Sequence, residues 1–477
     1  MNLAAYEMVI GLEVHVELKT ATKIFCDCPT AFGAEPNTQC CPVCTGMPGS
    51  LPVLNRQVVD YAVKAGLATN CKIARVSRED RKNYFYPDLP KAYQISQYDL
   101  PLCYQGYLDI EPGKAGGGKR IGVTRIHIEE DAGKLVHVEG RGTMIDCNRC
   151  GVPLIEIVSE PDLRSAQEAK AYLEKLRAIL LYTGVSDCRM QEGSLRCDVN
   201  LSVRKKGEDA LGTRTEMKNL NSFQYIVKAI EYEFRRQVEL VESGGEVVQE
   251  TRRFDQQSGK TCSMRRKEEA NDYRYFPDPD LAPIQVDEEH LEQLRQQIPP
   301  LPDQRKAVYV ERWGITPYAA EQLTYRRQIA DYFEQAAANT KYPHLAANLI
   351  LSEIYRLLPD EDSVIPISPV HLSGVADLLG MGRINSNAGR TLIEAMWRQD
   401  DAPEGLVKEL GLEQISNPQE LAAVARRVLE QNPAAVADYK SGKAAALQAL
   451  VGRVMGITQG KANPAVLQQV LEGLLAE

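Results

Sequence analysis

Apolar and polar residues alternate in the first part of the chain. In residues 12–18 every second position is apolar, and the positions between are Glu13, His15 and Glu17. This pattern predicts a β-strand with one apolar and one polar face. Shorter runs bounded by Gly, Pro or Asp predict further strands at residues 107–111, 121–128, 154–158 and 197–203.

Two segments among these strands have helical spacing instead. Ser165 and Glu168 form a capping box before a periodic apolar run, and Gly184 suits a left-handed helix end. A second helix is expected from residue 222 to 243, ending before Gly244 and Gly245. Strands with a few packed helices predict an α+β domain with a mixed or antiparallel sheet that forms a cradle.

The pattern changes near residue 296. The proline-rich run 298–302 is typical of a domain joint, and helical patterns dominate after it. A second break at residues 400–403 separates a last helical piece. We therefore expect an α+β domain at 1–296, an all-α domain at 297–403 and a small all-α tail at 404–477.

Composition limits the function classes. The chain has 477 residues and a net charge of −9, which argues against a protein that coats nucleic acid through clustered basic residues. It has neither an apolar run of about 18 residues nor a start typical of a secretory signal, so we expect a cytoplasmic protein without a membrane span. Residues 440–471 nevertheless contain no Asp or Glu and four basic residues, which form either a locally basic face or ordinary solvated helices: Lys440, Lys443, Arg453 and Lys461.

All twelve cysteines lie at or before Cys262. Two close pairs separated by a loop predict a structural zinc site, because each pair can present both sulfurs to one ion: Cys26 with Cys28, and Cys41 with Cys44. Cys40 is an alternative first member of the second pair. Unliganded buried thiols are the other interpretation.

Cys147 and Cys150 form a further CxxC motif without a second pair nearby. This signal is weaker, and it fits either plain thiols or an incidental redox pair.

Residues 113–120, GKAGGGKR, nearly match the phosphate-binding loop GxxxxGK[ST]. Arg120 occupies the position where a hydroxyl should reach Mg²⁺, and a strand follows instead of a helix. We therefore predict a β-hairpin here.

Carboxylates recur on the predicted strands. Glu13 and His15 share a strand face, residues 129–131 are three consecutive acids, Glu156 interrupts the apolar run LIEIV, and Asp198 lies on a further strand. A carboxylate buried without a partner costs several kcal/mol. These acids could hold divalent ions on phosphate oxygens. Ion pairs are the alternative, with Arg125, Arg149 and Arg196 as partners.

Residues 80–88, DRKNYFYPD, interleave basic and aromatic side chains, and residues 272–278 have a similar composition. Lys82 could neutralise a phosphate while the rings stack on a base. Alternatively, the rings pack as an aromatic turn beneath the sheet.

Several long motifs in order carry a resemblance to a known family. They are VIGLEVHVEL (9–18), FCDCP (25–29), FGAEPNT (32–38), DRKNYFYPDLPKAYQISQYD (80–99), IHIEEDAGK (126–134), PLIEIVSEPD (153–162), EGSLRCDVN (192–200), EMKNLNSF (216–223), DYRYFPDPDL (272–281), ADYKSGK (437–443) and GKANP (460–464). With these the chain closely resembles the B subunits of the tRNA-dependent amidotransferases over essentially its whole length.

The resemblance implies a cradle domain that carries the chemistry and two helical domains that hold tRNA. It implies a carbon–nitrogen ligase that uses ATP and Mg²⁺ to phosphorylate the side-chain carboxylate of Glu-tRNA(Gln) or Asp-tRNA(Asn). Ammonia then displaces phosphate. It comes through a tunnel from a separate glutaminase (amidase) subunit, in a heterotrimer that a small third subunit completes.

The resemblance also implies roles for individual residues. The primary Mg²⁺ ligands are implied to be His15, Glu130 and Glu156. A second ion or its water shell would involve Glu13, Glu192 and Asp198. Lys82 matches a basic position that meets the nucleotide phosphate, and the catalytic set is Lys82, Glu130 and Glu156. An imidazole is an unusual ligand for Mg²⁺, so the sequence leaves Mn²⁺ open.

A zinc-containing tRNA-binding scaffold is the competing hypothesis. The ligase and scaffold hypotheses make different predictions for Glu156, because a scaffold has no use for a carboxylate inside LIEIV. The chain has no recognisable Ser/Lys amidase signature, so the glutaminase is expected in another chain.

Overall fold

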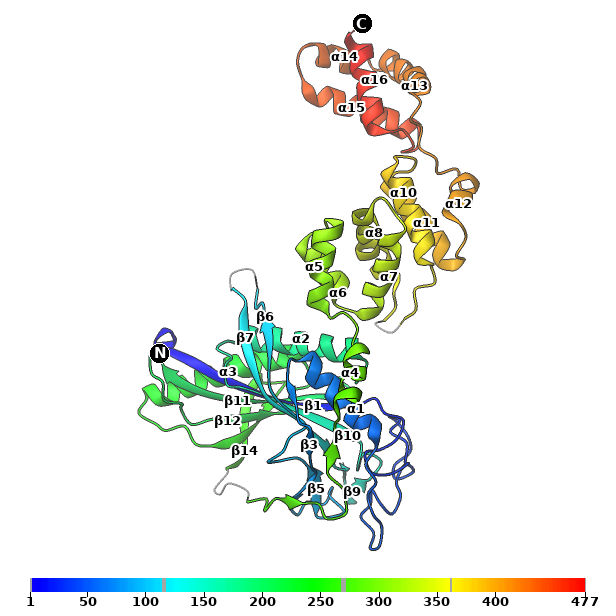
Figure 1. The fold of residues 1–477 in the computed structure, drawn as a ribbon. Helices are drawn as coiled ribbons and strands as arrows, with labels where there is room; N and C mark the ends of the chain where they lie inside the picture. The colour runs from blue at the N-terminus through cyan, green and yellow to red at the C-terminus, as the bar shows by residue number, and fades with distance from the viewer. Residues whose placement is uncertain (1, 114–116, 267–271, 361–362, 477) are drawn as a thin grey trace. The chain divides into compact units, whose positions relative to one another are not determined.

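The computed structural model describes residues 2–113, 117–266, 272–360 and 363–476. The chain forms two compact units, Met1–Leu301 and Pro302–Glu477. The first contains sheets and helices and the second is helical (Figure 1). None of the helices in these described ranges has the length and apolar character needed to cross a membrane.

The strands, all in the first unit, are β1 (Tyr6–Glu17), β2 (Lys72–Ile73), β3 (Val76–Ser77), β4 (Asp80–Asn83), β5 (Tyr93–Ser96), β6 (Cys103–Ile110), β7 (Lys119–Glu130), β8 (Lys134–Val138), β9 (Gly142–Asp146), β10 (Pro153–Ser159), β11 (Leu195–Lys205), β12 (Thr215–Lys218), β13 (Glu250–Asp255), β14 (Lys260–Arg266), β15 (Phe276–Pro277) and β16 (Ile284–Gln285). Its helices are the 3₁₀ turn η1 (Leu3–Ala5), α1 (Arg56–Ala68), α2 (Ala166–Thr183), α3 (Phe223–Glu242) and α4 (Glu288–Gln296).

Among the described residues, nine strands form the main sheet in the order β14-β13-β12-β11-β1-β10-β7-β6-β2. Neighbouring strands are antiparallel except β12 and β13, which are parallel, so the sheet is mixed. Smaller sheets have the orders β15-β4-β5, β16-β3 and β8-β9. The predicted α+β class is confirmed.

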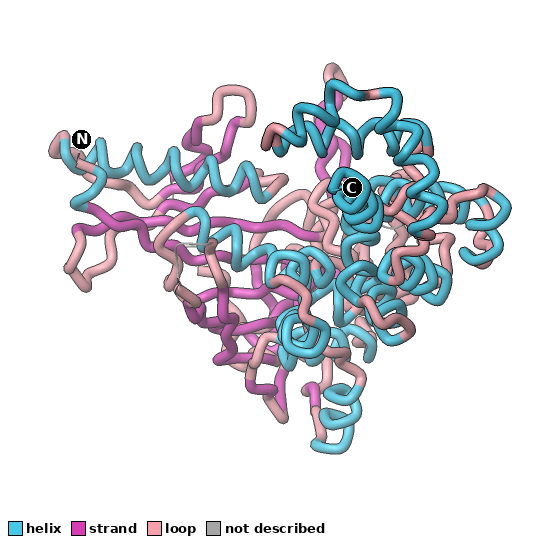
Figure 2. The backbone as a smooth tube through the Cα atoms, turned by 90° about the horizontal axis from the view of Figure 1, so that it is seen from above, coloured by secondary structure: helices cyan, strands magenta, loops and turns pink. Residues whose placement is uncertain are grey.

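The alternation in β1 decides which face of the sheet is covered. Leu12, Val14 and Val16 are fully or almost fully buried in the core of the unit. Helices α1, α2 and α3 pack against strands β7, β6 and β11 of this sheet (Figures 1 and 2). Successive side chains point to opposite faces, so Glu13 and His15 lie on the other face.

Both predicted helices are present. The Ser165 hydroxyl accepts the N–H of Glu168 at the start of α2, and Gly184 ends it with a φ of 71°. Ser222 caps α3 by accepting the N–H of Tyr225, and the helix ends before Gly244.

The first unit also contains two helices that the sequence patterns did not predict, α1 and α4. The buried positions of α1 are mostly small, such as Ala62 and Ala65, so its apolar pattern is weak. Asn55, whose side chain accepts the N–H of Gln57, was the available sequence signal for its start.

The segment resembling a phosphate loop joins a hairpin, as predicted. Strands β6 and β7 pair antiparallel up to Ile110 and Lys119, and the guanidinium of Arg120 contacts the Asp109 carboxylate at 2.8 Å. Positions 114–116 of this segment lie outside the described residues.

The helices of the second unit are α5 (Pro302–Trp313), α6 (Pro317–Thr324), α7 (Arg327–Ala338), α8 (Pro343–Leu349), the π-helical turn η2 (Ile350–Ile354), α9 (Tyr355–Leu357), α10 (Pro369–Gly380), α11 (Ser386–Arg398), α12 (Pro403–Glu409), α13 (Pro418–Gln431), α14 (Pro433–Lys440), α15 (Ala444–Ile457) and α16 (Pro464–Ala476). The last piece has its own core, built on Leu421, Leu450, Leu467 and Leu471. Of the basic residues noted above, Lys440, Lys443 and Arg453 are exposed, and Lys443 forms an ion pair with Asp438 at 2.8 Å.

Candidate active site on the polar face of the sheet

Strand register brings three functional side chains into one row. His15 of β1 lies directly opposite Glu156 of β10, which lies opposite His127 of β7. Residues directly opposite each other in antiparallel strands share a face of the sheet. Glu129 follows His127 by two positions in β7 and therefore joins the same face.

These four side chains form a compact cluster, the first polar group. His15 Nε2 lies 3.5 Å from Glu156 Oε2 and 3.6 Å from Glu129 Oε1. His127 Nε2 lies 3.3 Å from Glu156 Oε2 and 3.7 Å from Glu129 Oε2. One ligand atom each from His15, Glu129 and Glu156 lie within 4.8 Å of one another, so these three residues could hold a metal ion.

Without a metal ion, the imidazoles balance the two carboxylates. Burial favours the neutral form of Glu156, but the charges and hydrogen bonds of His127 and His15 hold its pKa well below the usual value. Burial likewise opposes the charged form of His15, but Glu156 and Glu129 outweigh it and raise its pKa to about 9. The two carboxylates thus favour a positive charge beside them, and without a metal ion the protonated imidazoles provide it.

A second polar group lies beside the first on the same face. Glu13 of β1 is opposite Asp198 of β11, and one oxygen from each and from Glu216 of β12 lie within 4.8 Å. Lys218 Nζ contacts Asp198 Oδ2 at 2.6 Å and Glu216 Oε1 at 3.2 Å. Three carboxylates around one ammonium form an all-oxygen set that suits a hard divalent cation.

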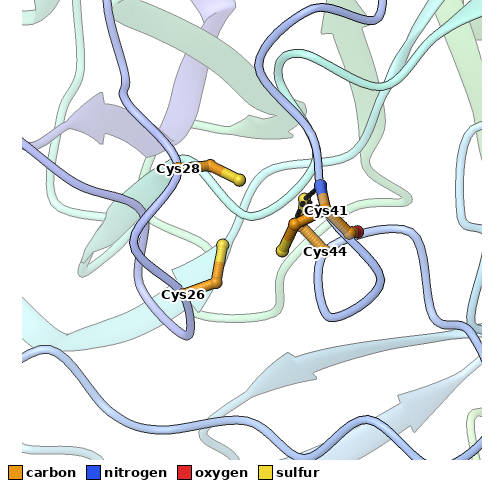
Figure 3. A group of neighbouring side chains, drawn as sticks. All are labelled: Cys26, Cys28, Cys41 and Cys44. Carbon is orange, nitrogen blue, oxygen red and sulfur yellow. Dashed lines mark hydrogen bonds between the residues drawn. The ribbon is translucent and has the colours of Figure 1, made fainter.

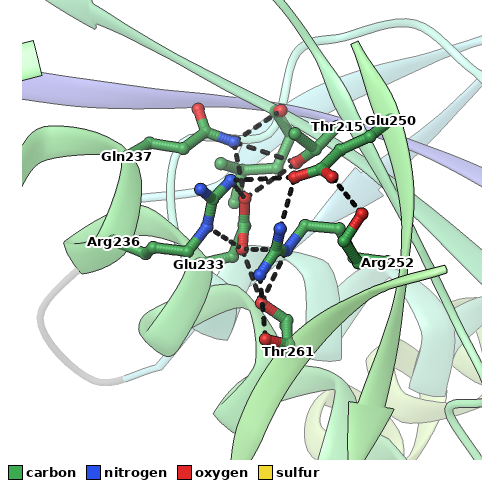
Figure 4. Close-up of polar contacts among 9 residues, drawn as sticks. Thr215, Glu233, Arg236, Gln237, Glu250, Arg252 and Thr261 are labelled. Atoms are coloured by element: carbon green, nitrogen blue, oxygen red, sulfur yellow. Dashed lines mark hydrogen bonds and ion pairs between the residues drawn. The ribbon is translucent and has the colours of Figure 1, made fainter. Parts of the chain in front are cut away.

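A buried ionic network fixes the strand that carries Glu216. Glu233 of α3 is fully buried and accepts hydrogen bonds from Thr215 of β12 and Thr261 of β14, at 3.0 and 2.8 Å. Its carboxylate also pairs with Arg236 at 2.6 Å and with Arg252 of β13 at 3.3 Å (Figure 4). The network ties α3 to this edge of the sheet.

The structure does not bring Glu130 to His15 and Glu156. Glu130 forms an ion pair with Lys91 and accepts the N–H of Ile95 at 2.8 Å. It lines a cavity of about 190 Å³ together with Lys91 and Lys23. Consecutive strand residues point to opposite faces, so Glu129, and not Glu130, reaches the first polar group.

Glu192 belongs to neither group: it precedes β11 and pairs with Arg189 at 2.9 Å. Sequence reasoning counted Glu129 among the acids that could hold divalent ions, but the resemblance selected Glu130 instead, and neither selected His127 or Glu216. Strict alternation from His127 would have selected Glu129 over Glu130. Glu216 required the pairing of β11 with β12, which the sequence does not show.

The ion-pair interpretation holds for the third acid of the run 129–131. Asp131 Oδ2 contacts Arg196 at 2.7 Å and Arg149 at 3.5 Å. Glu129 and Glu156 meet histidines instead.

The charge of Lys82 helps to lower the pKa of Glu129, against burial and together with His127 and His15. Lys82 therefore lies close to the first polar group. Its Nζ lies 5.0 Å from the ring centroid of Tyr273, and β4 pairs with β15 of the second aromatic motif. Phe85 is 91% exposed, so the alternative interpretation, rings packed beneath the sheet, is wrong for that residue.

Four cysteines converge on one point. The sulfurs of Cys26, Cys28, Cys41 and Cys44 lie within 4.8 Å of one another (Figure 3). Cys44 Sγ also accepts the N–H of Cys41 at 3.1 Å and a hydrogen bond from Lys23 at 3.5 Å. The Cys40 thiol turns away and donates to the Asn37 carbonyl at 3.3 Å, which favours Cys41 as the ligand. This group can bind a metal ion.

Comparison with known families fits this arrangement. Residues 8–292 match the family described as the GatB/GatE catalytic domain, and residues 331–475 match the GatB domain. The chain belongs to the GatB family. Both polar groups and the four cysteines lie within the matched catalytic domain, and the last helical piece lies within the matched GatB domain.

Relatives in the GatB family span the same length. The chain is 58% identical to the B subunit of the aspartyl/glutamyl-tRNA(Asn/Gln) amidotransferase of Caldicellulosiruptor saccharolyticus, over 98% of both chains. The B subunits of Carboxydothermus hydrogenoformans and Geotalea daltonii are 55% and 53% identical, over 99% and 98% of both chains. The resemblance inferred from the motifs is confirmed.

Proposed function

We propose that this chain is the amide-forming subunit of a tRNA-dependent amidotransferase. It acts on Glu attached to tRNA(Gln), Asp attached to tRNA(Asn), or both. The observation that carries the proposal is the row of carboxylates and imidazoles on one face of the sheet, in a chain whose relatives bear the corresponding name.

The reaction is an ATP-dependent ligation in two steps. A carboxylate oxygen of the substrate bonds to the γ-phosphorus of ATP and ADP leaves. Ammonia then attacks the acyl carbon, inorganic phosphate leaves with the electrons of the C–O bond, and the nitrogen loses a proton. Positioned charge provides most of the catalysis in such phosphoryl transfers.

The two polar groups would hold Mg²⁺: His15, Glu129 and Glu156 in the first, and Glu13, Asp198 and Glu216 in the second. When bound, the ions neutralise phosphate oxygens and orient the attacking carboxylate. Lys82, beside the first group, meets the nucleotide phosphate. Lys218 pairs with Asp198 and Glu216 and so partly neutralises the second group.

The four cysteines hold a structural zinc, because four thiolates leave the ion no open position. Glu130 and Lys91 face the cavity behind the sheet, and we assign this cavity to the ammonia route. Residues 1–296 perform the chemistry and residues 297–403 and 404–477 hold tRNA. The partners are a glutaminase (amidase) subunit with a small third subunit, in the cytoplasm.

Reconstitution with the glutaminase and the small third subunit tests the proposal. The complex is supplied with glutamine, ATP and either Glu-tRNA(Gln) or Asp-tRNA(Asn), and the aminoacyl group is analysed. We expect ATP-dependent formation of Gln-tRNA(Gln), Asn-tRNA(Asn) or both. Binding of both tRNAs without any amide formation would favour the scaffold hypothesis instead.

A further inference from the structure

Cys147 and Cys150 lie in the tight turn between β9 and β10. The N–H of Cys150 donates to the carbonyl of Cys147 at 3.1 Å, which closes a four-residue turn. Such a turn holds its first and last Cα atoms within about 7 Å, and disulfides need about 4.4–6.8 Å. The Cys150 thiol donates to the Asp88 carbonyl at 3.8 Å, and the Cys147 sulfur is near enough to help raise the pKa of Cys150, after burial.

This pair is separate from the four-cysteine group. Among the described residues, the sulfurs that gather around one point are those of Cys26, Cys28, Cys41 and Cys44. Cys147 and Cys150 are both free thiols. Nothing in the chemistry proposed above uses them.

The two thiols differ in exposure. Cys147 is half-buried, whereas Cys150 is 3% exposed. Burial, with the adjacent Cys147 sulfur, raises the pKa of Cys150. An oxidant in solution therefore meets Cys147 first, and the buried Cys150 is placed to displace whatever group Cys147 acquires.

The turn also lies next to the four-cysteine group and the cavity lined by Glu130. Lys23 Nζ donates to the carbonyl of Cys147 at 3.3 Å and to Cys44 Sγ at 3.5 Å. A Cβ on Gly151, the next residue, would lie 3.5 Å from Cys44 Cβ and 4.0 Å from Glu130 Oε2. A covalent change in this turn thus occurs beside both the four-cysteine group and the cavity.

We propose that Cys147 and Cys150 are a dithiol modification site that low-molecular-weight disulfides oxidise. The Cys147 thiolate attacks one sulfur of the small disulfide, whose S–S bond breaks and releases one thiol. The Cys150 sulfur then attacks Cys147 and releases the second thiol. Overall, two cysteine S–H groups become one S–S bond, and the small disulfide is reduced to two thiols.

Cys40 is the competing partner for Cys147, because the two sulfurs are close enough to interact electrostatically. The sequence allows a direct distinction. Trypsin cleaves after Arg149, between the two cysteines, so a Cys147–Cys150 bond joins peptide 142–149 to peptide 150–164. A Cys40–Cys147 bond joins a different pair of peptides.

The test treats the full chain with oxidised glutathione, blocks free thiols, digests with trypsin and identifies linked peptides by mass spectrometry. We expect the 142–149/150–164 link in the wild type, its loss on reduction, and its persistence in Cys40→Ser and in Cys262→Ser, which removes an exposed thiol. In Cys150→Ser we expect a glutathione adduct on Cys147. A Cys40–Cys147 link, a stable glutathione adduct on wild-type Cys147, or absence of any modification at Cys147 would overturn the proposal.

Discussion

Glu129 and Glu130 are adjacent in sequence but lie on opposite sides of β7. Glu129 lies within 3.6 Å of His15 Nε2, whereas Glu130 pairs with Lys91 at the wall of the cavity. Strand β7 thus places one carboxylate, Glu129, in the candidate metal site and a second carboxylate, Glu130, in the wall of the cavity.

This separation predicts different effects of two matched substitutions. Glu129→Gln should weaken binding of a divalent ion by about tenfold or more, because the first polar group loses one of two carboxylates. Glu130→Gln should change the affinity by less than about twofold, because its side chain lies on the other face. Titration of the chain with Mn²⁺, followed by electron paramagnetic resonance, measures both. Equal losses in the two variants would contradict the assignment.

The histidines predict a pH dependence of stability in the absence of divalent ions. The pKa of His15 is about 9 in the folded chain and 6.5 in its ordinary state, so its contribution is complete below pH 6.5. As the pH rises through about 9, the imidazolium loses its proton and the contribution is lost. The raised pKa of His127 acts in the same direction, against burial, through Glu156 and Glu129.

Denaturant unfolding with a chelator present, from pH 6.5 to 9.5, measures this fall in the free energy of unfolding. His15→Gln should make the fall smaller, whereas His344→Gln, at an exposed position of the second unit, should leave it as in the wild type. An unchanged pH profile in His15→Gln would show that His15 is not charged in the folded chain.

The four-cysteine group predicts which thiol the metal needs. Cys41→Ser should lose bound zinc, because tetrahedral thiolate sites need all four ligands. Cys40→Ser should keep about one zinc ion per chain, since its thiol points to Asn37. Elemental analysis of the purified variants gives the answer. Zinc loss in Cys40→Ser with retention in Cys41→Ser would reverse the assignment.

The buried network around Glu233 predicts a large effect on stability. Glu233→Ala leaves Arg236 and Arg252 with Glu250 as their remaining carboxylate, removes the acceptor of the Thr215 and Thr261 hydroxyls, and should cost about 3–5 kcal/mol. Glu231→Ala, at an exposed position of the same helix, should cost at most about 0.5 kcal/mol. Denaturant unfolding of both variants compares them. Similar small losses would show that the network does not hold α3 to the sheet.

The sequence was sufficient for the strands and helices with strong periodicity. The alternation in β1 predicted both its buried side and the polar side that carries Glu13 and His15. Helix α1 was not predicted, because small buried residues such as Ala62 give little periodic contrast in hydrophobicity. Local sequence patterns do not show which strands pair. Glu216 lies beside Glu13 and Asp198 because of the register of three strands, β1, β11 and β12.

The central claim is that the polar face of the sheet performs phosphoryl transfer. The most direct measurement is ATP hydrolysis by the reconstituted complex in the presence of misacylated tRNA. It compares Glu156→Gln with the control Glu192→Gln. Glu192 pairs with Arg189 and belongs to neither polar group. We predict that Glu156→Gln lowers tRNA-dependent turnover by about 100-fold or more while tRNA affinity is kept, and that Glu192→Gln stays within about threefold of the wild type. Wild-type turnover in Glu156→Gln would contradict the claim.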